Sequence, residues 1–230
     1  MDIKRRIKTA FFSASILMAS AQAFAADAYT NFAEYLKGME TLSGKFQQEI
    51  YDQEGVEIQK TNGDFKVKRP GYFWWNVAPP YEQLVVGTPD NLQIYDPDLE
   101  QLTIHEKDSL AGSPALLMSG DIEAIKKSYD ISESKNKDQV TFNLKHKSNE
   151  ESPFDTLALV FIEKEGKKNT ADQTSASEKF TSQLRHMNFT DKLGQRTNVT
   201  FSELVPNVSL DIKAFLFEAP EGTDVIVDGP

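Results

Sequence analysis

One arginine stands in an otherwise apolar alternation between Gly63 and Trp75. If this stretch is a strand, Phe65, Val67 and Arg69 share one of its faces. A guanidinium carries several N–H donors and keeps its charge in proteins. Because an unpaired charge is costly away from water, we expect Arg69 to hydrogen-bond to acceptors inside the protein. The chemistry that this pattern predicts is strong hydrogen bonding within an apolar interior.

The residue patterns of common catalytic and metal sites are missing from the sequence. The three histidines are scattered, and no two of His105, His146 and His186 have the spacing of metal ligands. The chain has no cysteine, no Gly-x-Ser-x-Gly elbow and no Gly-x-x-x-x-Gly-Lys-Ser/Thr loop. Carboxylates are numerous, but they gather in turns such as residues 96–98. We therefore expect a binding protein without catalytic residues, metal or cofactor.

Residues 1–25 have the pattern of a cleaved export signal. Basic side chains within positions 4–8 precede an apolar run at 10–19 and the small-x-small sequence Ala23-Phe24-Ala25. The apolar run is too short to span a bilayer. A membrane-associated N-terminal helix is the alternative interpretation. We predict a signal peptide at residues 1–25, a single domain at residues 26–230 and a location in the periplasm of a Gram-negative bacterium.

The charge balance restricts the partners of this protein. The chain has 25 Lys+Arg and 35 Asp+Glu, a formal net charge of −10 at pH 7. Loss of residues 1–25 removes four bases and one acid, which leaves 21 against 34 and a net charge of −13. An acidic surface disfavours nucleic acid and stable insertion into an anionic membrane. We expect a monomer that diffuses freely or docks on basic patches. Without cysteine it is neither a lipoprotein nor disulfide-bonded.

Two stretches of the sequence have helical spacing. The first is expected to begin at Thr30 or Asn31 and to close at Gly44, with an apolar side formed by Phe32, Tyr35, Leu36, Met39 and Leu42. The second is a pair of short helices in mid-chain. Its first member is capped by Ser113 and carries residues 115–118; its second is capped by Asp121 and carries Ile122, Ile125 and Tyr129.

The remaining apolar residues alternate with the period of strands. Asn62-Gly63 predicts a hairpin turn, and the segment at 166–179 is polar enough to be a flexible hairpin tip. Further strands are expected around residues 83–86, 92–95, 102–104, 140–144, 157–162, 187–189, 199–201 and 215–217. So long an antiparallel sheet curls. The helices are the natural cover for the face that it curls around.

Several blocks of residues, taken together, resemble one family. They are, in chain order, Gly63-Asp64-Phe65, Lys68-Arg69-Pro70, Phe73, Trp75, Pro80, Gln83-Leu84-Val85-Val86, the run from Tyr95 to Gln101, Ser113-Pro114-Ala115-Leu116-Leu117, and the run from Phe215 to Val225. The chain resembles the LolA family, periplasmic carriers that ferry lipoproteins from the inner to the outer membrane. The resemblance covers most of residues 26–230 and departs from the family pattern at residues 87–91 and 166–179.

The resemblance implies a fold, a cargo and partners. The fold would be an incomplete, unclosed antiparallel β-barrel with a helical lid over a hydrophobic cavity, and the cargo would be the acyl chains of a lipoprotein. The inner-membrane Lol ABC transporter would be the donor and the outer-membrane lipoprotein LolB the acceptor. The family's matching arginine implies that Arg69 hydrogen-bonds to the lid-helix backbone and holds the lid shut when no cargo is bound.

The strands and helices supply candidates for the cavity and its lid. The acyl-binding candidates are Phe65, Val67, Phe73, Trp75, Leu84, Val86, Leu92 and Ile94. The lid candidates are Leu36, Met39, Leu116, Leu117 and Met118. For each cavity candidate the alternative is plain core packing, and for the lid it is helices packed permanently on the sheet.

Two other functions compete with the carrier. The first is a periplasmic LolA-like lipid-binding protein or envelope-stress sensor, which in the sensor case would need room for a second domain. LolB itself needs a lipid-bearing cysteine, which this chain lacks. The second, from another class, is an envelope hydrolase acting on lipid or glycan.

Overall fold

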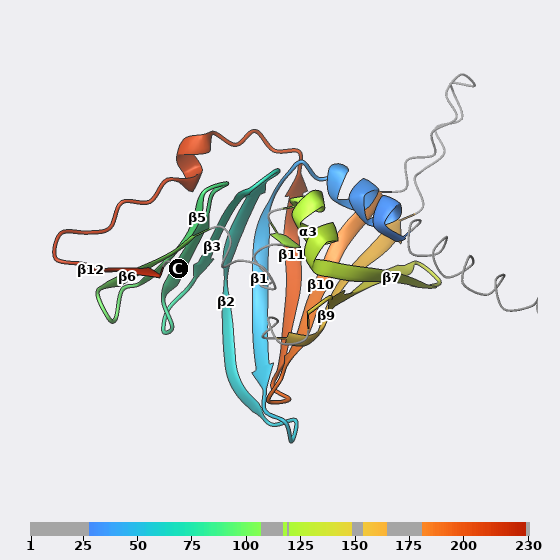
Figure 1. The fold of residues 1–230 in the computed structure, drawn as a ribbon, viewed down its shortest axis with the longest axis horizontal. Coiled ribbons are helices and arrows are strands. Elements are labelled where there is room, and N and C mark those ends of the chain that lie inside the picture. The colour runs from blue at the N-terminus through green and yellow to red at the C-terminus, as the bar shows by residue number, and fades with distance from the viewer. Residues whose placement is uncertain (1–27, 107–116, 119, 149–153, 165–180, 229–230) are drawn as a thin grey trace, which may run out of the picture.

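The computed structural model describes residues 28–106, 117, 118, 120–148, 154–164 and 181–228. A single sheet of twelve strands forms most of this part of the chain, in the order β12-β6-β5-β4-β3-β2-β1-β11-β10-β9-β8-β7 (Figure 1). The strands are β1 (Thr41–Tyr51), β2 (Glu57–Lys68), β3 (Tyr72–Val77), β4 (Gln83–Gly87), β5 (Asn91–Asp96), β6 (Gln101–Glu106), β7 (Tyr129–Asn136), β8 (Gln139–His146), β9 (Phe154–Lys164), β10 (Thr181–Asp191), β11 (Arg196–Pro206) and β12 (Asp224–Asp228).

The sheet is curled but not closed, which confirms the predicted fold class. Its edges are β12 and β7, and within the described residues they do not pair with each other. Figure 1 shows the helix of residues 28–37, in blue, and α3 (Ile122–Ser128) at the upper end of the curved sheet. All neighbouring strands are antiparallel except β12, which runs parallel to β6 and was not predicted.

The two faces of the sheet follow from the strand register. Phe65 lies opposite Trp75, and Val67 lies opposite Phe73, so these side chains share one face, called the inner face here. The inner face and the helices form one apolar cluster. Phe32 of the first helix is 1% exposed and packs edge-on against the Phe142 ring at 5.1 Å. The helical cover consists of residues 28–37, Leu117, Met118 and α3.

The first helix differs from its prediction at its C-terminal end. It ends at residue 37, so Leu42 and Gly44 belong to β1. Gly44 is needed there because a Cβ would lie 2.7 Å from the Leu204 side chain and 2.9 Å from the Ser202 carbonyl oxygen. The helix already includes Thr30 and Asn31, which therefore do not cap it. Gly44 therefore allows close packing between neighbouring strands and does not mark the end of a helix.

The predicted hairpin at Asn62-Gly63 is wrong, because both residues lie inside β2. A Cβ on Gly63 would come within 2.7 Å of the Phe46 ring. Phe46 stacks on Trp75 with ring centroids 3.6 Å apart, so the glycine makes room for this stack. The turn that joins β1 to β2 lies at residues 52–56, as the sequence Asp52 to Gly55 predicts, and there the Asp52 carboxylate accepts hydrogen bonds from two backbone N–H groups.

The mid-chain and C-terminal predictions have mixed outcomes. Asp121 caps α3 as expected, accepting from the Ala124 N–H at 3.0 Å, but Tyr129 begins β7. Phe215 ends the 3-10 helix η2 (Ile212–Phe215) instead of starting a strand, and the last strand is β12. Residues 1–25, 113–116 and 166–179 lie outside the described residues. β9 and β10, which flank the last of these segments in the sequence, pair antiparallel.

Candidate functional site

Arg69 lies in the turn between β2 and β3, and not in a strand as predicted. Its side chain still reaches the interior, where Nη1 donates a hydrogen bond to the main-chain oxygen of Met39, just beyond the first helix. The Nε atom is buried and has no hydrogen-bond partner among the described residues. Burial lowers the pKa of Arg69 to about 10, which leaves the guanidinium charged at neutral pH.

The same side chain also touches the second helical segment. Gly120 follows the helical residues Leu117 and Met118, and a Cβ on it would lie 2.5 Å from Arg69 Nε. Gly120 has φ +68°, a left-handed conformation that favours glycine. In addition, the Arg69 N–H donates to the Glu40 carbonyl oxygen at 2.8 Å. Arg69 therefore bridges the turn that follows the first helix and the residue that follows the second.

Most of the predicted cavity and lid residues meet in the apolar cluster. Phe65, Val67, Phe73, Trp75 and Leu92 are buried on the inner face, and Ile94 packs against them partly buried. Leu36, Met39, Leu117 and Met118 enter the same cluster from the helical cover. Leu116 lies outside the described residues. The structure thus brings the candidate lid and the candidate cavity wall into direct apolar contact.

Two predicted cavity residues lie on the opposite, outer face. Val86 pairs with Trp74 across β3 and β4, whereas Val85 pairs with Trp75 of the inner face. Leu84 has the same parity as Val86 and shares its face. β4 carries apolar side chains on both faces, so its sequence alone does not show which face is the inner one. Val85, which was missed, could have been found by counting register from Trp75.

The outer face has a small apolar core of its own. Val86, Leu102 and Phe215 are buried but do not join the main cluster. The Phe215 ring packs against Tyr72 at 5.6 Å between centroids, and Phe217 packs against Tyr95 at 5.0 Å. The C-terminal segment therefore covers the outer side of β3 to β6. This packing explains why Leu84 and Val86 are apolar without facing a cavity.

Polar contacts join the first helix to the far side of the sheet. Tyr35 Oη donates to Glu163 of β9 at 2.5 Å, and Asn31 Nδ2 donates to Glu133 of β7 at 2.7 Å. Lys135 forms an ion pair with Glu163. Burial alone would raise the pKa of Glu163. The hydrogen bonds from Lys135 and Tyr35 outweigh this effect, so the pKa of Glu163 is lowered. The sequence did not reveal the contacts of Tyr35 and Asn31, because their partners lie about a hundred residues or more away along the chain.

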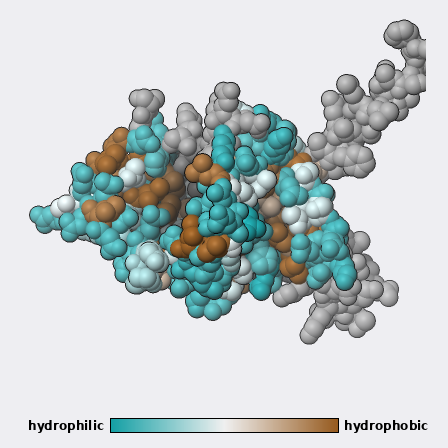
Figure 2. All heavy atoms as spheres, turned by 90° about the horizontal axis from the view of Figure 1, so that it is seen from below, coloured by the Kyte–Doolittle hydropathy of each residue, from teal (hydrophilic) through white to brown (hydrophobic). Residues whose placement is uncertain are grey.

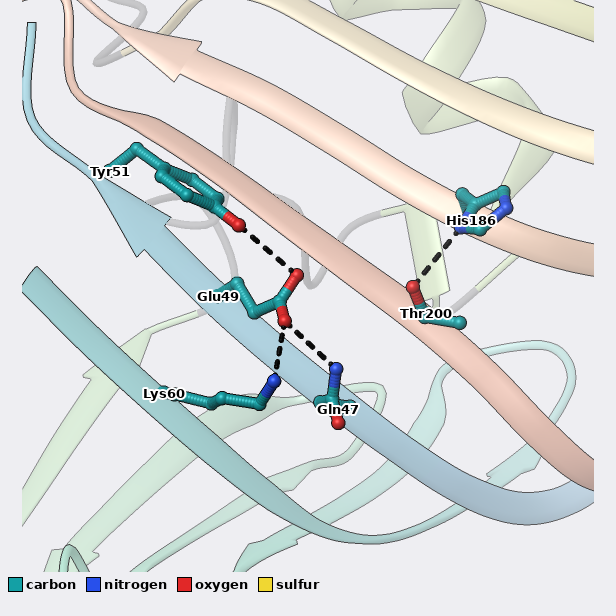
Figure 3. Close-up of polar contacts among 6 residues, drawn as sticks. All are labelled: Gln47, Glu49, Tyr51, Lys60, His186 and Thr200. Atoms are coloured by element: carbon teal, nitrogen blue, oxygen red, sulfur yellow. Dashed lines mark hydrogen bonds and ion pairs between the residues drawn. The ribbon is translucent and has the colours of Figure 1, made fainter. Parts of the chain in front are cut away.

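The outer face of β1, β2 and β10 is polar and internally hydrogen-bonded (Figure 3). Glu49 Oε1 accepts from Lys60 at 2.8 Å and from Gln47 at 3.0 Å. The His186 Nδ1 lies 3.2 Å from the Thr200 hydroxyl. In the described part of the chain, no group of three or more His, Cys, Asp or Glu could hold a metal ion. The contacts of this face are those of a solvated sheet surface.

Fold and site together define a class: a curled, unclosed β-sheet protein whose apolar inner face is covered by helices and bridged by one arginine. Residues 37–177 match the family model described as "Outer membrane lipoprotein carrier protein LolA". The chain belongs to the LolA family. Within the described residues, no helix has the length and apolar character needed to cross a membrane.

Individual relatives agree with this membership. A protein of Pseudomonas aeruginosa strain UCBPP-PA14, named outer-membrane lipoprotein carrier protein, is 38% identical over 224 residues, covering 96% of this chain and 99% of the relative. A protein of the same name from Hahella chejuensis is 36% identical over 233 residues and covers both chains fully. A solved DUF1329 family protein from Desulfovibrio piger has a TM-score of 0.50 at 14% identity, covering 84% of this chain and 97% of that one. This last likeness concerns the fold alone.

Proposed function

We propose that this protein carries lipoproteins through the periplasm and shields their acyl chains between the inner face and the helical cover. The observation that carries the proposal is the single apolar cluster that Phe65, Trp75 and Val67 form with Met39 and Leu117. The names of the relatives support it. In this proposal residues 1–25 direct export, and the mature domain acts as a monomer without enzyme activity.

The energetics of acyl burial explain why such a carrier needs partners. Burying one methylene is worth about 0.8 kcal/mol, so a chain of roughly a dozen gives on the order of 10 kcal/mol. Extraction from a bilayer is therefore steeply uphill. The sequence has no nucleotide-binding loop, so the work comes from a donor. We assign this role to the inner-membrane Lol ABC transporter and the acceptor role to LolB.

Arg69 is the proposed latch of the helical cover. Its bond to the Met39 carbonyl and its contact with Gly120 are made while the cover lies on the sheet. Hydrogen bonds from a charged donor are worth about 1.5–3 kcal/mol each. Acyl chains that enter must separate these groups, so the latch subtracts from the net affinity for cargo. A carrier weakened in this way releases its cargo to an acceptor that binds more tightly.

The direct test is release of lipoprotein from spheroplasts by the purified mature protein. We expect an inner-membrane lipoprotein to leave in a soluble complex with it. Ile94→Asp, which places a charge against the apolar cluster, should abolish release. Ile226→Asp makes the same change at a position 42% exposed on β12 and should release normally. If no lipoprotein leaves with the wild-type chain when a functioning transporter is present, the carrier proposal fails.

A further inference from the structure

The inner face changes character from one end of the strands to the other. Near the helical cover it carries Val67 and Leu92, which are buried and apolar. At the opposite end, the same alternation places Gln48 opposite Thr61, with Gln83 nearby on β4. These side chains offer hydrogen-bonding groups that an acyl chain does not use.

A pocket of about 390 Å³ lies at this polar end. It is within the range of about 300–1,000 Å³ typical of ligand sites. Figure 2 views the molecule from below and shows hydrophobic residues set back between polar ones. We call this pocket the end pocket, and it is lined by Gln48, Gln59, Thr61, Val77, Tyr81, Glu82, Gln83, Asp96, Asp98 and Leu99.

Thr61 contributes a buried hydroxyl to the wall of the end pocket. Its side chain belongs to the pocket wall and the residue is only 6% exposed, yet its hydroxyl has no hydrogen-bond partner among the described residues. A buried polar group left unpaired costs free energy. A ligand that brings a hydrogen-bonding group to this hydroxyl would remove that cost.

The rim of the end pocket selects for positive charge. Glu82 and Asp98 are exposed carboxylates on the loops at this end. Asp96 holds the β5–β6 turn, since its Oδ1 accepts from the backbone N–H of Asp98 at 3.1 Å and of Leu99 at 3.2 Å. Carboxylates favour an ammonium and disfavour a phosphate. This disfavours a phospholipid headgroup as the occupant.

We propose that the end pocket binds the polypeptide segment next to the acylated end of the cargo and prefers a lysine there. The inference rests on the proposed function. Peptide groups both donate and accept hydrogen bonds, as glutamine amides do, and a lysine stem can lie along Val77, which belongs to the pocket and the apolar cluster alike. The pocket lies at the end away from the helical cover, so the cargo polypeptide leaves without passing beneath it.

The test uses the mature chain and two synthetic lipopeptides with identical diacylated N-terminal cysteines. One continues with lysines, and its twin continues with glutamates. We expect the lysine form to bind about tenfold more tightly to the wild-type chain, the size of one charged hydrogen bond. Glu82→Gln combined with Asp98→Asn should bring this ratio close to one. Asp90→Asn combined with Glu221→Gln removes the same charge elsewhere on the exposed surface and should preserve it.

Thr61→Val tests whether the lipopeptide contacts the pocket wall itself, beyond a general attraction between its lysines and the acidic protein. It keeps the shape of the side chain and leaves the net charge unchanged. We expect it to weaken binding of the lysine lipopeptide severalfold while stability to denaturant is unchanged or higher, because an unpaired buried hydroxyl is lost. Equal binding by Thr61→Val and the wild type would remove the hydroxyl from the site and overturn the proposal.

The outcomes distinguish the pocket from the carrier function. If neither lipopeptide binds, the proposed function fails. If both bind equally and the Glu82→Gln, Asp98→Asn variant behaves as wild type, the carrier stands and the pocket proposal is overturned. Binding of dodecylamine in preference to dodecanoate, with equal binding of the two lipopeptides, would assign the pocket to an aminolipid. That result would also overturn the pocket proposal.

Discussion

Arg69 and Met39 are thirty residues apart in sequence, and the guanidinium of one donates to the main-chain oxygen of the other. The bond joins the β2–β3 turn to the residues that follow the first helix. That helix is held to β7 and β9 by Asn31 and Tyr35. Arg69 therefore links the β2–β3 side of the sheet to a helix anchored on the other side.

The latch predicts that Arg69→Leu takes up cargo and transfers it poorly. The closed latch competes with bound cargo, so loss of its charged hydrogen bond, about 1.5–3 kcal/mol, raises the affinity for cargo. Tighter binding slows hand-over about tenfold or more. The measurement is transfer from the purified complex to the acceptor. Arg196→Leu is the matched control, because Arg196 lies over the Tyr51 ring at 5.9 Å in the β1–β11 pair. Normal hand-over by Arg69→Leu would rule out the latch.

Gly120→Ala should weaken the latch from its other side. The added methyl collides with the Arg69 side chain, and the left-handed backbone adds about 1–3 kcal/mol of strain. Gly222→Ala has a similar φ of +93° but nothing within 4 Å of the new methyl, so it reports strain alone. We expect only Gly120→Ala to slow hand-over. Its effect should be non-additive with Arg69→Leu, because both changes act on one contact.

Phe215→Ala should destabilise the fold although it lies far from the inner face. Phe215 is fully buried where the C-terminal segment packs on Tyr72 of β3, and truncation of a buried Phe costs about 3–5 kcal/mol. Leu216→Ala, at a residue 66% exposed, should change stability by less than about 0.5 kcal/mol. Denaturant titration measures both. Equal stability of the two variants would show that the outer core contributes little.

Protonation of Glu163 should lower the free energy of unfolding below pH 4.5. Its pKa lies below the ordinary value of 4.5 in the folded protein, so its stabilisation is complete above pH 4.5 and is lost as pH falls through the folded pKa. Glu163→Gln should cost about 1–3 kcal/mol at pH 7 and flatten the pH dependence below 4.5. Unfolding free energies at several pH values test this. A wild-type slope in Glu163→Gln would assign the acid sensitivity to other carboxylates.

Local chemistry made much of this molecule predictable. Asp121 caps α3 because its carboxylate accepts a hydrogen bond from an N–H group that the first turn of the helix leaves unpaired. Phe65 and Val67 lie on the inner face because side chains alternate along any strand. The family blocks around Arg69 and from Tyr95 to Gln101 gave the correct family. Each of these inferences depends on neighbours in sequence.

The errors concern contacts between distant segments. Gly63 has the sequence of a turn, yet Phe46 from another strand needs the space of its missing side chain. Leu84 and Val86 are as apolar as cavity residues, but the C-terminal segment covers their face. Arg69 was predicted to lie in a strand and instead reaches the interior from a turn.

The sequence by itself determined the alternation of the strands, the cap of α3, the acidic charge and the family. Only the tertiary structure decided which face of β4 is the inner one, where Arg69 finds its acceptor, and that Thr61 lines a polar pocket. The reason is physical. Periodicity follows from the geometry of a single chain, whereas burial and pairing depend on which other segment packs there.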